Sequence, residues 1–453
     1  MKLVKNPCLR LTALRRCHAA SSSTAAAATD FDCDGGVGTR SDVKHQKPSS
    51  NASPRHLKYQ LYSLLGSASP GRLSAALSIV RGMLPPDSTS PPDAATRSIV
   101  FSGLAKRSQP LNEESLALLV EMAKMGLFPH DAILFSQFIT KLCRCGATSG
   151  AWDFFHAVKD AGGSFEASVC NALLTGLAAI QDFTRMNLLF SEMKGLGVRP
   201  NVFTFGILIN SLCKSRRIDD ALNVLDAMSS PDSGVTPGTI IFNTVIDGLC
   251  KAGRLQDGLS LLDRMKSSHA CDPDSVTYTS LIDAFCKAGD FSKVDKFLKE
   301  MVDEGCKPNV VTYGTLINGY CKSGDLEQAM KIFKSMDVSM VPANTVIYTT
   351  LIDSYCKNQK VDAAIYLFDE MQEKDILPNV RTYTAIFKGL KNHNMSDKAF
   401  ELMDKMNLQG CKPDYVAMVL LTGWLTVIGE TERLRLFVQR TTSSNIDSGN
   451  PDV

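Results

Sequence analysis

Apolar residues recur at intervals of three and four along most of the chain, a spacing typical of amphipathic helices. In the stretch that begins at Val310, one apolar stripe consists of Tyr313, Leu316, Ile317 and Tyr320. After a break at "KSG", a second stripe consists of Leu326, Ala329, Ile332, Phe333 and Met336. Pro342 then blocks a further helical turn. The stretch therefore predicts two helices, which we call helix A and helix B.

This pair of helices recurs about every 35 residues. The opening "VVTYGTLINGYCKSG" at Val310 is matched by "SVTYTSLIDAFCKAG" at Ser275 and "TVIYTTLIDSYCKNQ" at Thr345. Further copies begin at Ala167, Val202, Thr239 and Val380, with a weaker copy over 132–166 and a degenerate one over 94–131. Because one helix pair cannot bury both of its faces alone, neighbouring pairs must stack. The sequence therefore predicts an all-α fold, a right-handed superhelical α-solenoid of tandem ~35-residue helix-turn-helix repeats.

The two ends of the chain differ in composition from the repeats. The first 29 residues contain five basic residues and no acid, followed by a Ser/Ala run, which is typical of an organelle transit peptide. The segment "LRLTALRR" can form a basic amphipathic helix, which favours the mitochondrion, whereas "SSSTAAAAT" also suits a chloroplast signal. A disordered N-terminus without an address is the alternative. We divide the chain into a transit peptide (1–30), a disordered linker (31–54), degenerate helical repeats (55–131), the repeat solenoid (132–414), a truncated capping repeat (415–439) and a disordered tail (440–453).

Composition narrows the class of protein further. The chain has 453 residues, of which 44% are hydrophobic and 21% are charged, as in ordinary folded proteins. A net charge of +2 gives no global electrostatic case for nucleic acid, so that case depends on where the basic residues lie. No apolar run reaches the roughly 18 to 20 residues that a membrane helix needs, so we expect no membrane span.

The sequence contains no pattern typical of a catalytic or metal site. The phosphate loop "GxxxxGK[ST]", the zinc motif "HExxH" and the deaminase signature are all missing. One cysteine per repeat lacks the paired spacing of zinc ligands; these are Cys213, Cys250, Cys286, Cys321 and Cys356. We expect them to be small, buried, apolar residues in a reducing compartment. We therefore expect no enzyme activity, no cofactor and no metal.

The pattern "VTY-x-x-LI-x-x-x-CK-x-G" with a closing "P-[ND]" resembles the pentatricopeptide repeat family over residues 94–439. The tetratricopeptide family fits less well, because this chain has only two tryptophans, Trp152 and Trp424, and not one in each repeat. The resemblance implies a repeat-only (P-class) plant protein of an organelle that binds single-stranded RNA, with one repeat addressing one base. It also implies other RNA-processing factors as partners. The alternative is a helical scaffold that binds proteins.

A reader of one base per repeat needs polar side chains at two fixed places. The fifth residues of successive repeats are Asn171, Gly206, Asn243, Thr279, Gly314, Thr349 and Thr384. The last residues are Asn201, Gly238, Asp274, Asn309, Asn344, Asn379 and Asp414. Helix capping, which favours Asn and Asp, also explains the last residues but not the restriction of the fifth to Asn, Thr or Gly.

In the family, these two residues together select a base. Aspartate only accepts hydrogen bonds and so suits the ring N–H of uracil or guanine, whereas asparagine can donate to the bare ring nitrogen of adenine or cytosine. The implied bases are U for Asn243 with Asp274, A for Thr279 with Asn309, A for Thr349 with Asn379, G for Thr384 with Asp414, and a pyrimidine for Asn171 with Asn201. Gly206 with Gly238 should read no base, and Gly314 with Asn344 should discriminate weakly. The implied site is 5′-pyrimidine-N-U-A-(A or C)-A-G-3′.

Two further rows complete the predicted RNA groove. The second residues, which would flank the bases, are Phe203, Ile240, Val276, Val311, Val346 and Arg381. Packing in the protein core is the alternative for the apolar ones. The thirteenth residues, which would contact phosphates, are Lys214, Lys251, Lys287, Lys322 and Lys357. A solvated position at the negative end of a helix is the alternative for these lysines.

Overall fold

The computed structural model describes residues 54–65, 70–83, 93–106, 111–267 and 271–443, all of them helices or the short turns between helices. The expected transit peptide, nearly all of the linker and most of the C-terminal tail lie outside these residues. Within the described ranges there are 22 α-helices, one short 3-10 helix and no strand. The prediction of an all-α repeat solenoid is confirmed. No helix in these ranges has the length and apolarity to cross a membrane.

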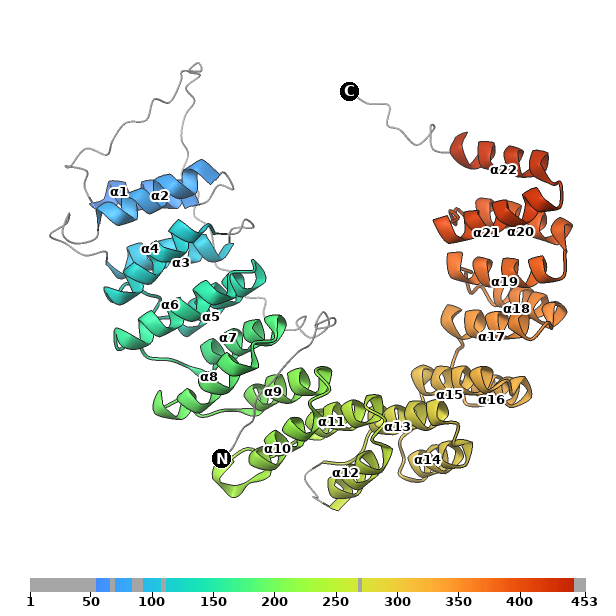
Figure 1. The fold of residues 1–453 in the computed structure, drawn as a ribbon, viewed down its shortest axis with the longest axis horizontal. Helices are drawn as coiled ribbons and strands as arrows, with labels where there is room; N and C mark the ends of the chain where they lie inside the picture. Colours follow the sequence, from blue (N-terminus) through green and yellow to red (C-terminus); the bar gives the residue numbers. More distant parts are fainter. Residues whose placement is uncertain (1–53, 66–69, 84–92, 107–110, 268–270, 444–453) are drawn as a thin grey trace. The chain divides into compact units, whose positions relative to one another are not determined.

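The chain forms two compact units, residues 1–237 and 238–453. The described helices of unit 1 are α1 (Pro54–Leu65), α2 (Pro70–Gly82), α3 (Ala94–Lys106), α4 (Glu113–Lys124), α5 (Ala132–Arg144), α6 (Thr148–Asp160), α7 (Ala167–Ile180), α8 (Phe183–Gly195), α9 (Val202–Lys214), α10 (Ile218–Ser229) and the 3-10 helix η1 (Pro231–Ser233). Each helix A (α3, α5, α7 and α9) packs on the next, and α2, α4 and α6 pack on one another in a second layer (Figure 1).

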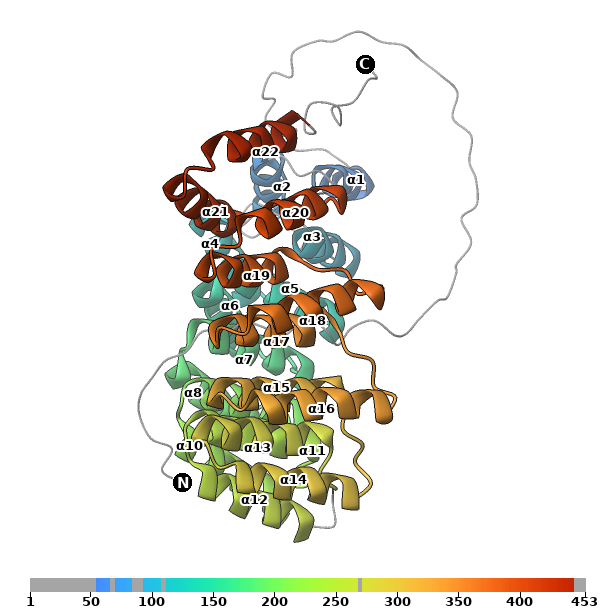
Figure 2. The same ribbon diagram turned by 90° about the vertical axis from the view of Figure 1, so that its right-hand side faces the viewer.

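Unit 2 again has each helix A packed on the helix A of the next repeat. Its helices are α11 (Thr239–Lys251), α12 (Leu255–Ser267), α13 (Ser275–Ala288), α14 (Phe291–Asp303), α15 (Val310–Ser323), α16 (Leu326–Val338), α17 (Thr345–Lys357), α18 (Val361–Glu373), α19 (Val380–Asn392), α20 (Ser396–Leu408), α21 (Tyr415–Val427) and α22 (Thr431–Ser443). Residues 440–443, expected to belong to the tail, are thus the end of α22. Figure 2 shows α13, α15, α17 and α19 stacked in chain order, each beside its helix B.

Local sequence explains where each helix A begins and ends. All of the expected repeat starts from Ala132 to Tyr415 coincide with the first residue of a helix. The start of α15 is set by Asn309, whose side chain accepts hydrogen bonds from the backbone N–H groups of Val311 and Thr312. Its end is set by Gly324, which adopts the left-handed conformation (φ 86°) that favours glycine.

The core of each unit lies between the two helical layers. In unit 2, a tyrosine occupies the fourth position of the four repeats that start at residues 275, 310, 345 and 380, and three of them, Tyr278, Tyr348 and Tyr383, are fully buried. The ring of Phe333 on α16 meets that of Tyr348 edge to face, with centroids 5.2 Å apart. Ala329 on α16 is also fully buried and leaves room for this close packing. Stacking of the repeats thus fixes helix A of each repeat next to helix A of the following one.

Candidate nucleic-acid interface

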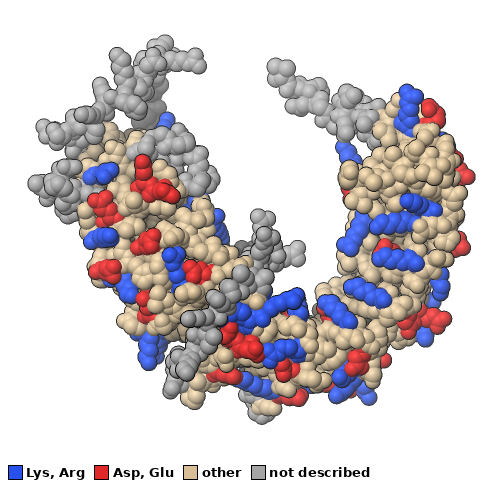
Figure 3. Space-filling model, in the orientation of Figure 1, with Lys and Arg blue, Asp and Glu red and all other residues tan. Residues whose placement is uncertain are grey.

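A groove of about 900 Å³ crosses α15, α17 and α19 in unit 2. Ten of the predicted site residues line it, namely Val311, Gly314, Lys322, Asn344, Val346, Thr349, Lys357, Asn379, Arg381 and Thr384. Figure 3 shows Lys and Arg side chains following one another along this part of the molecule. The structure therefore brings together reading, flanking and basic residues from three successive repeats.

The last residue of each repeat caps the next helix A through one terminal atom of its side chain. In Asn201, Asp274, Asn309, Asn344, Asn379 and Asp414, it is Oδ1 that accepts the backbone N–H bonds at the helix start. Among the described residues, only Asn309 uses its second terminal atom, where Nδ2 donates to Ser275 Oγ at 3.4 Å. These six residues therefore do cap helices. Capping leaves Nδ2 of Asn201, Asn344 and Asn379 and Oδ2 of the two aspartates available for another partner. Gly238 begins α11 without a side-chain cap.

Two of the predicted reading pairs are joined directly by hydrogen bonds. Asn243 Nδ2 donates to Asp274 Oδ1 at 2.9 Å, and Asn171 Nδ2 donates to Asn201 Oδ1 at 3.3 Å. In the two pairs that have Thr at the fifth position and Asn at the last, the two residues are connected through the threonine at the third position of the next repeat. Its hydroxyl oxygen lies within hydrogen-bonding distance of both Thr279 and Asn309 in one case, and of both Thr349 and Asn379 in the other. No such link joins Thr384 to Asp414 among the described residues, because Ala417 stands at the third position there.

The electrostatic state of Asp274 follows from these bonds. Burial acts to raise the pKa of its carboxyl, but the hydrogen bonds from the backbone N–H of Thr277, the amide of Asn243 and the backbone N–H of Val276 outweigh burial and hold the pKa below its ordinary value. The three N–H groups of described residues that donate to this side chain all bond Oδ1, which also lies 3.1 Å from the Thr277 hydroxyl oxygen. At neutral pH, Oδ2 is therefore a charged acceptor without a proton to donate.

The apolar second residues are exposed, which excludes the alternative that they pack in the core. The exposed fraction is 77% for Phe203 and 81% for Ile240, and it exceeds one half for Val276, Val311 and Val346. Arg381 at the same position is also exposed. The structure adds Val416, which is the second residue of the truncated repeat and is 55% exposed. Counting the period one repeat further would have identified it from sequence.

The thirteenth-position lysines lie at the ends of their helices, and three of them already have a carboxylate partner. Lys251, Lys287 and Lys357 form ion pairs with Asp247, Asp283 and Asp353, each at 2.5 Å and one helical turn earlier. At the equivalent place before Lys322 stands Asn318, and Lys322 has no ion pair with a described residue. These aspartates were not identified from the sequence. The spacing of four residues between each aspartate and its lysine, which places both on one face of a helix, could have revealed the ion pairs. Lys388, which lines the groove, was not identified from the sequence either.

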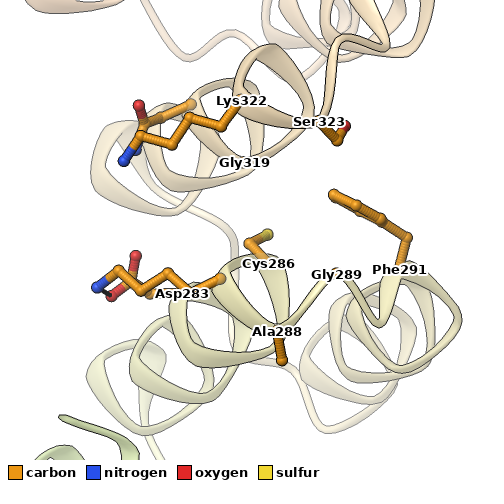
Figure 4. Close-up of a pocket in the computed structure, with 10 residues that line it drawn as sticks. Asp283, Cys286, Ala288, Gly289, Phe291, Gly319, Lys322 and Ser323 are labelled. Atoms are coloured by element: carbon orange, nitrogen blue, oxygen red, sulfur yellow. Dashed lines mark hydrogen bonds and ion pairs between the residues drawn. The ribbon is translucent and has the colours of Figure 1, made fainter.

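The cysteines serve packing between repeats. Figure 4 shows Cys286 of α13 pointing toward the part of α15 that carries Gly319. A Cβ atom at Gly319 would lie 2.5 Å from the Sγ of Cys286, and Gly389 meets Cys356 in the same way at 2.4 Å. Burial raises the pKa of the Cys286 thiol to about 11, so the thiol stays protonated at neutral pH. Within the described ranges, no group of three or more His, Cys, Asp or Glu side chains is placed to hold a metal.

Comparison with known proteins points to one family. The PPR repeat family model matches residues 237–287, 273–322, 308–345 and 343–392, and two further PPR repeat models match residues 196–229 and 381–411. Two pentatricopeptide repeat-containing proteins of Arabidopsis thaliana, one of them named mitochondrial, are each 36% identical to the chain over 158 residues. That alignment covers 35% of this chain and 20% of each relative, so the match spans about a fifth of the length of these relatives.

Solved structures agree on the fold. The crystal structure of the pentatricopeptide repeat protein PPR10 from maize is 21% identical and has a TM-score of 0.56, covering 86% of this chain and 54% of PPR10. A structure of PPR10 in complex with an 18-nt psaJ RNA element gives a TM-score of 0.52 and covers 88% of this chain and 57% of PPR10. These structures agree with the family on the fold. The repeat models over residues 196–229 and 237–411, together with the curated relatives, show that these residues are repeats of the pentatricopeptide repeat family.

Proposed function

We propose that this protein binds single-stranded RNA in a sequence-specific way, with one repeat reading one base. The observation that carries the proposal is the groove over α15, α17 and α19, in which polar reading residues, exposed flanking residues and basic residues of three successive repeats lie together. The structure of PPR10 with bound RNA, a protein of the same family and fold, is consistent with this function.

The capping geometry supports the chemistry of base selection. In the repeat that ends at Asp274, the unpaired Oδ2 can accept the N3–H of uracil, and the second hydrogen of Asn243 Nδ2 can donate to a uracil carbonyl. In the repeat that ends at Asn379, the free Nδ2 can donate to N1 of adenine. Exposed apolar side chains such as Val311 and Val346 would be covered by the faces of the bases between them.

The proposed RNA site is 5′-pyrimidine-N-U-A-(A or C)-A-G-3′, read by repeats from Ala167 to Asp414. Four fixed bases recur by chance about once in 256 positions, which is too often for a unique target. We infer that the degenerate N-terminal repeats or other RNA-processing factors supply the remaining specificity.

The proposed mode of action is occupancy without catalysis, as in repeat-only (P-class) members of the family. A protein that covers an RNA segment blocks exonucleases, or it keeps the segment single-stranded for splicing, cleavage or translation factors. We propose that it acts in an organelle. Relatives named mitochondrial favour the mitochondrion, with the chloroplast as the alternative.

Exchanging Asp274 for Asn tests the base-reading role. Asp274→Asn replaces an acceptor by a donor while keeping the cap, so we expect the preferred third base to change from U toward C, by about 1 to 3 kcal/mol in relative binding free energy. Binding of the full-length protein to RNAs that differ only at this base, measured by fluorescence anisotropy, gives the preference.

A matched control separates base reading from net charge. Asp353→Asn makes the same change in charge on helix A of another repeat, outside the reading positions. It should leave the preference at every base unchanged. An unchanged U preference in Asp274→Asn would contradict the reading role, and absence of RNA binding by the native protein would favour the protein-binding scaffold.

A further inference from the structure

We propose that the threonine at the third position of four repeats orients the base-reading residue of the repeat before it, and thereby helps to determine the preferred base. This inference rests on the proposed function. It concerns Thr204, Thr277, Thr312 and Thr382, none of which follows from the two-residue pattern of base selection. All four side chains are fully buried, so they would act through the reading residue and not by touching RNA.

The same contact recurs in four places. Thr204 Oγ1 lies 2.8 Å from Asn171 Oδ1, and Thr277 Oγ1 lies 2.5 Å from Asn243 Oδ1. Thr312 Oγ1 lies 2.9 Å from the hydroxyl of Thr279, and Thr382 Oγ1 lies 2.7 Å from that of Thr349. In each case a third-position hydroxyl meets the polar atom of a fifth-position residue in the preceding repeat.

Counting protons fixes the direction of the bond to Asn243. The backbone N–H of Asp274 donates to Thr277 Oγ1 at 3.0 Å, and the single hydroxyl proton of Thr277 goes to the nearer of its two candidate acceptors, Asn243 Oδ1 at 2.5 Å rather than Asp274 Oδ1 at 3.1 Å. The amide oxygen of Asn243 must then face Thr277, which places Nδ2 at Asp274 Oδ1. A flipped amide would bring its oxygen against the Asp274 carboxylate and lose the hydrogen bond from Nδ2 to Asp274 Oδ1. Asn243 therefore has one N–H left for the base, while its amide oxygen faces Thr277.

The same count of protons applies to the fifth-position threonines, Thr279 and Thr349, but here it leaves an acceptor for the base and not a donor. The hydroxyls of Thr279 and Thr349 donate to the carbonyls of Ser275 and Thr345, both at 2.6 Å. Each must therefore accept the proton of its third-position partner, Thr312 or Thr382. With its proton held by its own helix, each reader offers a lone pair, which suits the exocyclic amine of adenine.

The repeats that lack a reading side chain also lack the third-position hydroxyl. Gly314 is followed by Ile347 at the third position, and Gly206 is followed in the sequence by Ile241. The helix that contains Ile347 still begins normally, because Asn344 accepts from the backbone of Val346 and Ile347. The third-position hydroxyl is thus dispensable for starting a helix. It accompanies four of the five reading side chains, and the exception is Thr384, which is followed by Ala417.

Two substitutions in neighbouring repeats test the inference and serve as controls for each other. Thr277→Val and Thr312→Val each remove one buried hydroxyl that also takes part in a capping box, so their structural effects are alike. We expect Thr277→Val to reduce the preference for U at the third base about fivefold, the size of one neutral hydrogen bond, and to leave the fourth base unaffected. Thr312→Val should reduce the preference for A at the fourth base and leave the third unaffected. Thr277→Ser, which keeps the hydroxyl, should retain the U preference.

The readout is the ratio of dissociation constants for RNAs that differ at one base, measured with the full-length protein. Unchanged ratios in both valine variants, or an equal loss at both bases in each variant, would overturn the inference. The proposed function fails by a different result, namely an unchanged base preference in Asp274→Asn.

A gain-of-function experiment remains informative if a valine variant does not fold. A Cβ atom at Gly314 would meet only Ile347 Cγ1, at 3.8 Å, so a side chain fits there. Gly314→Thr alone should prefer A at the fifth base less strongly than Gly314→Thr combined with Ile347→Thr, which supplies the missing hydroxyl. Equal preferences in the single and double variants would overturn the inference.

Discussion

Gly319 shows how tightly the repeats pack at the scale of single residues. A Cβ atom there would lie 2.5 Å from Cys286 Sγ and 2.7 Å from Cys286 Cβ, and the second of these atoms cannot move without the backbone. Gly176 and Gly389 contact Cys143 and Cys356 with similar closeness. The glycine and the cysteine of the preceding repeat are therefore one packing unit.

Gly319→Ala should destabilise the protein. Overpacking typically costs about 1 to 3 kcal/mol, which exceeds the roughly 1 kcal/mol that alanine gains over glycine in a helix. Gly423→Ala is the matched control, because Gly423 also lies in a helix A and a Cβ atom there would meet nothing within 4 Å. The control should be neutral or stabilising. Urea unfolding followed by the helical circular dichroism signal gives both values, and equal shifts in one direction would refute this packing account.

Single residues also mark how far sequence reasoning reaches. The identity of Asp274 and Asn379 suggested both capping and base reading, and the structure shows that different atoms of one side chain are available for the two roles. The sequence could not assign these atoms, because the assignment depends on how the neighbouring repeat is placed. The hydrogen bond from Thr277 to Asn243 could not be predicted for the same reason, although the Thr of the "VTY" motif recurs in the sequence.

At the scale of one helix, α9, α11, α13, α15 and α17 each combine a packed face, an exposed apolar second residue and a lysine in the last turn. The bounds of these helices followed from sequence because caps, glycines and prolines are local signals. The ion pairs within α11, α13 and α17 were missed because they depend on the helical phase of two residues four apart. These pairs make the lysines unequal: Lys322, beside Asn318, has no competing carboxylate one turn earlier.

Lys322 should therefore contribute more to RNA binding than Lys287. Lys322→Met should reduce the slope of log Kd against log salt by about one unit, as expected for one lost phosphate contact. Lys287→Met should reduce it by less, because Asp283 already pairs with that lysine. Binding of one RNA at several salt concentrations measures both slopes. Asn318→Asp, which recreates the acidic partner, should make Lys322 behave like Lys287, and equal slopes for the two methionine variants would contradict this ranking.

At the scale of the whole molecule, specificity is the sum of what individual repeats read. The repeat that starts at Val202 has glycine at both reading positions and should contribute contacts without selecting a base. The division of the chain at Pro237 and Gly238 could not be foreseen, because the repeat pattern runs through it and the division depends on helix packing.

Supplying the missing side chains should add one base to the site. Gly206→Asn together with Gly238→Asp recreates the pair found at Asn243 and Asp274, and a Cβ atom at Gly238 meets nothing within 4 Å. We expect the double variant to prefer U at the second base, where the native protein has no preference, by about 1 to 3 kcal/mol. Sequencing of RNAs selected from a randomised pool by each protein would reveal the change. A second base that stays random in the double variant would argue against one repeat reading one base.

The caps carry a consequence for how such a protein changes its target over evolutionary time. Asn and Asp start a helix about equally well, and both do so here through Oδ1. Exchanging Asn for Asp therefore replaces only the second terminal atom, Nδ2 by Oδ2, and should change the free energy of unfolding little. A single-nucleotide mutation of an Asn or Asp codon can thus rewrite one letter of the recognised sequence while the protein stays intact, so its lineage can follow a drifting RNA site one base at a time.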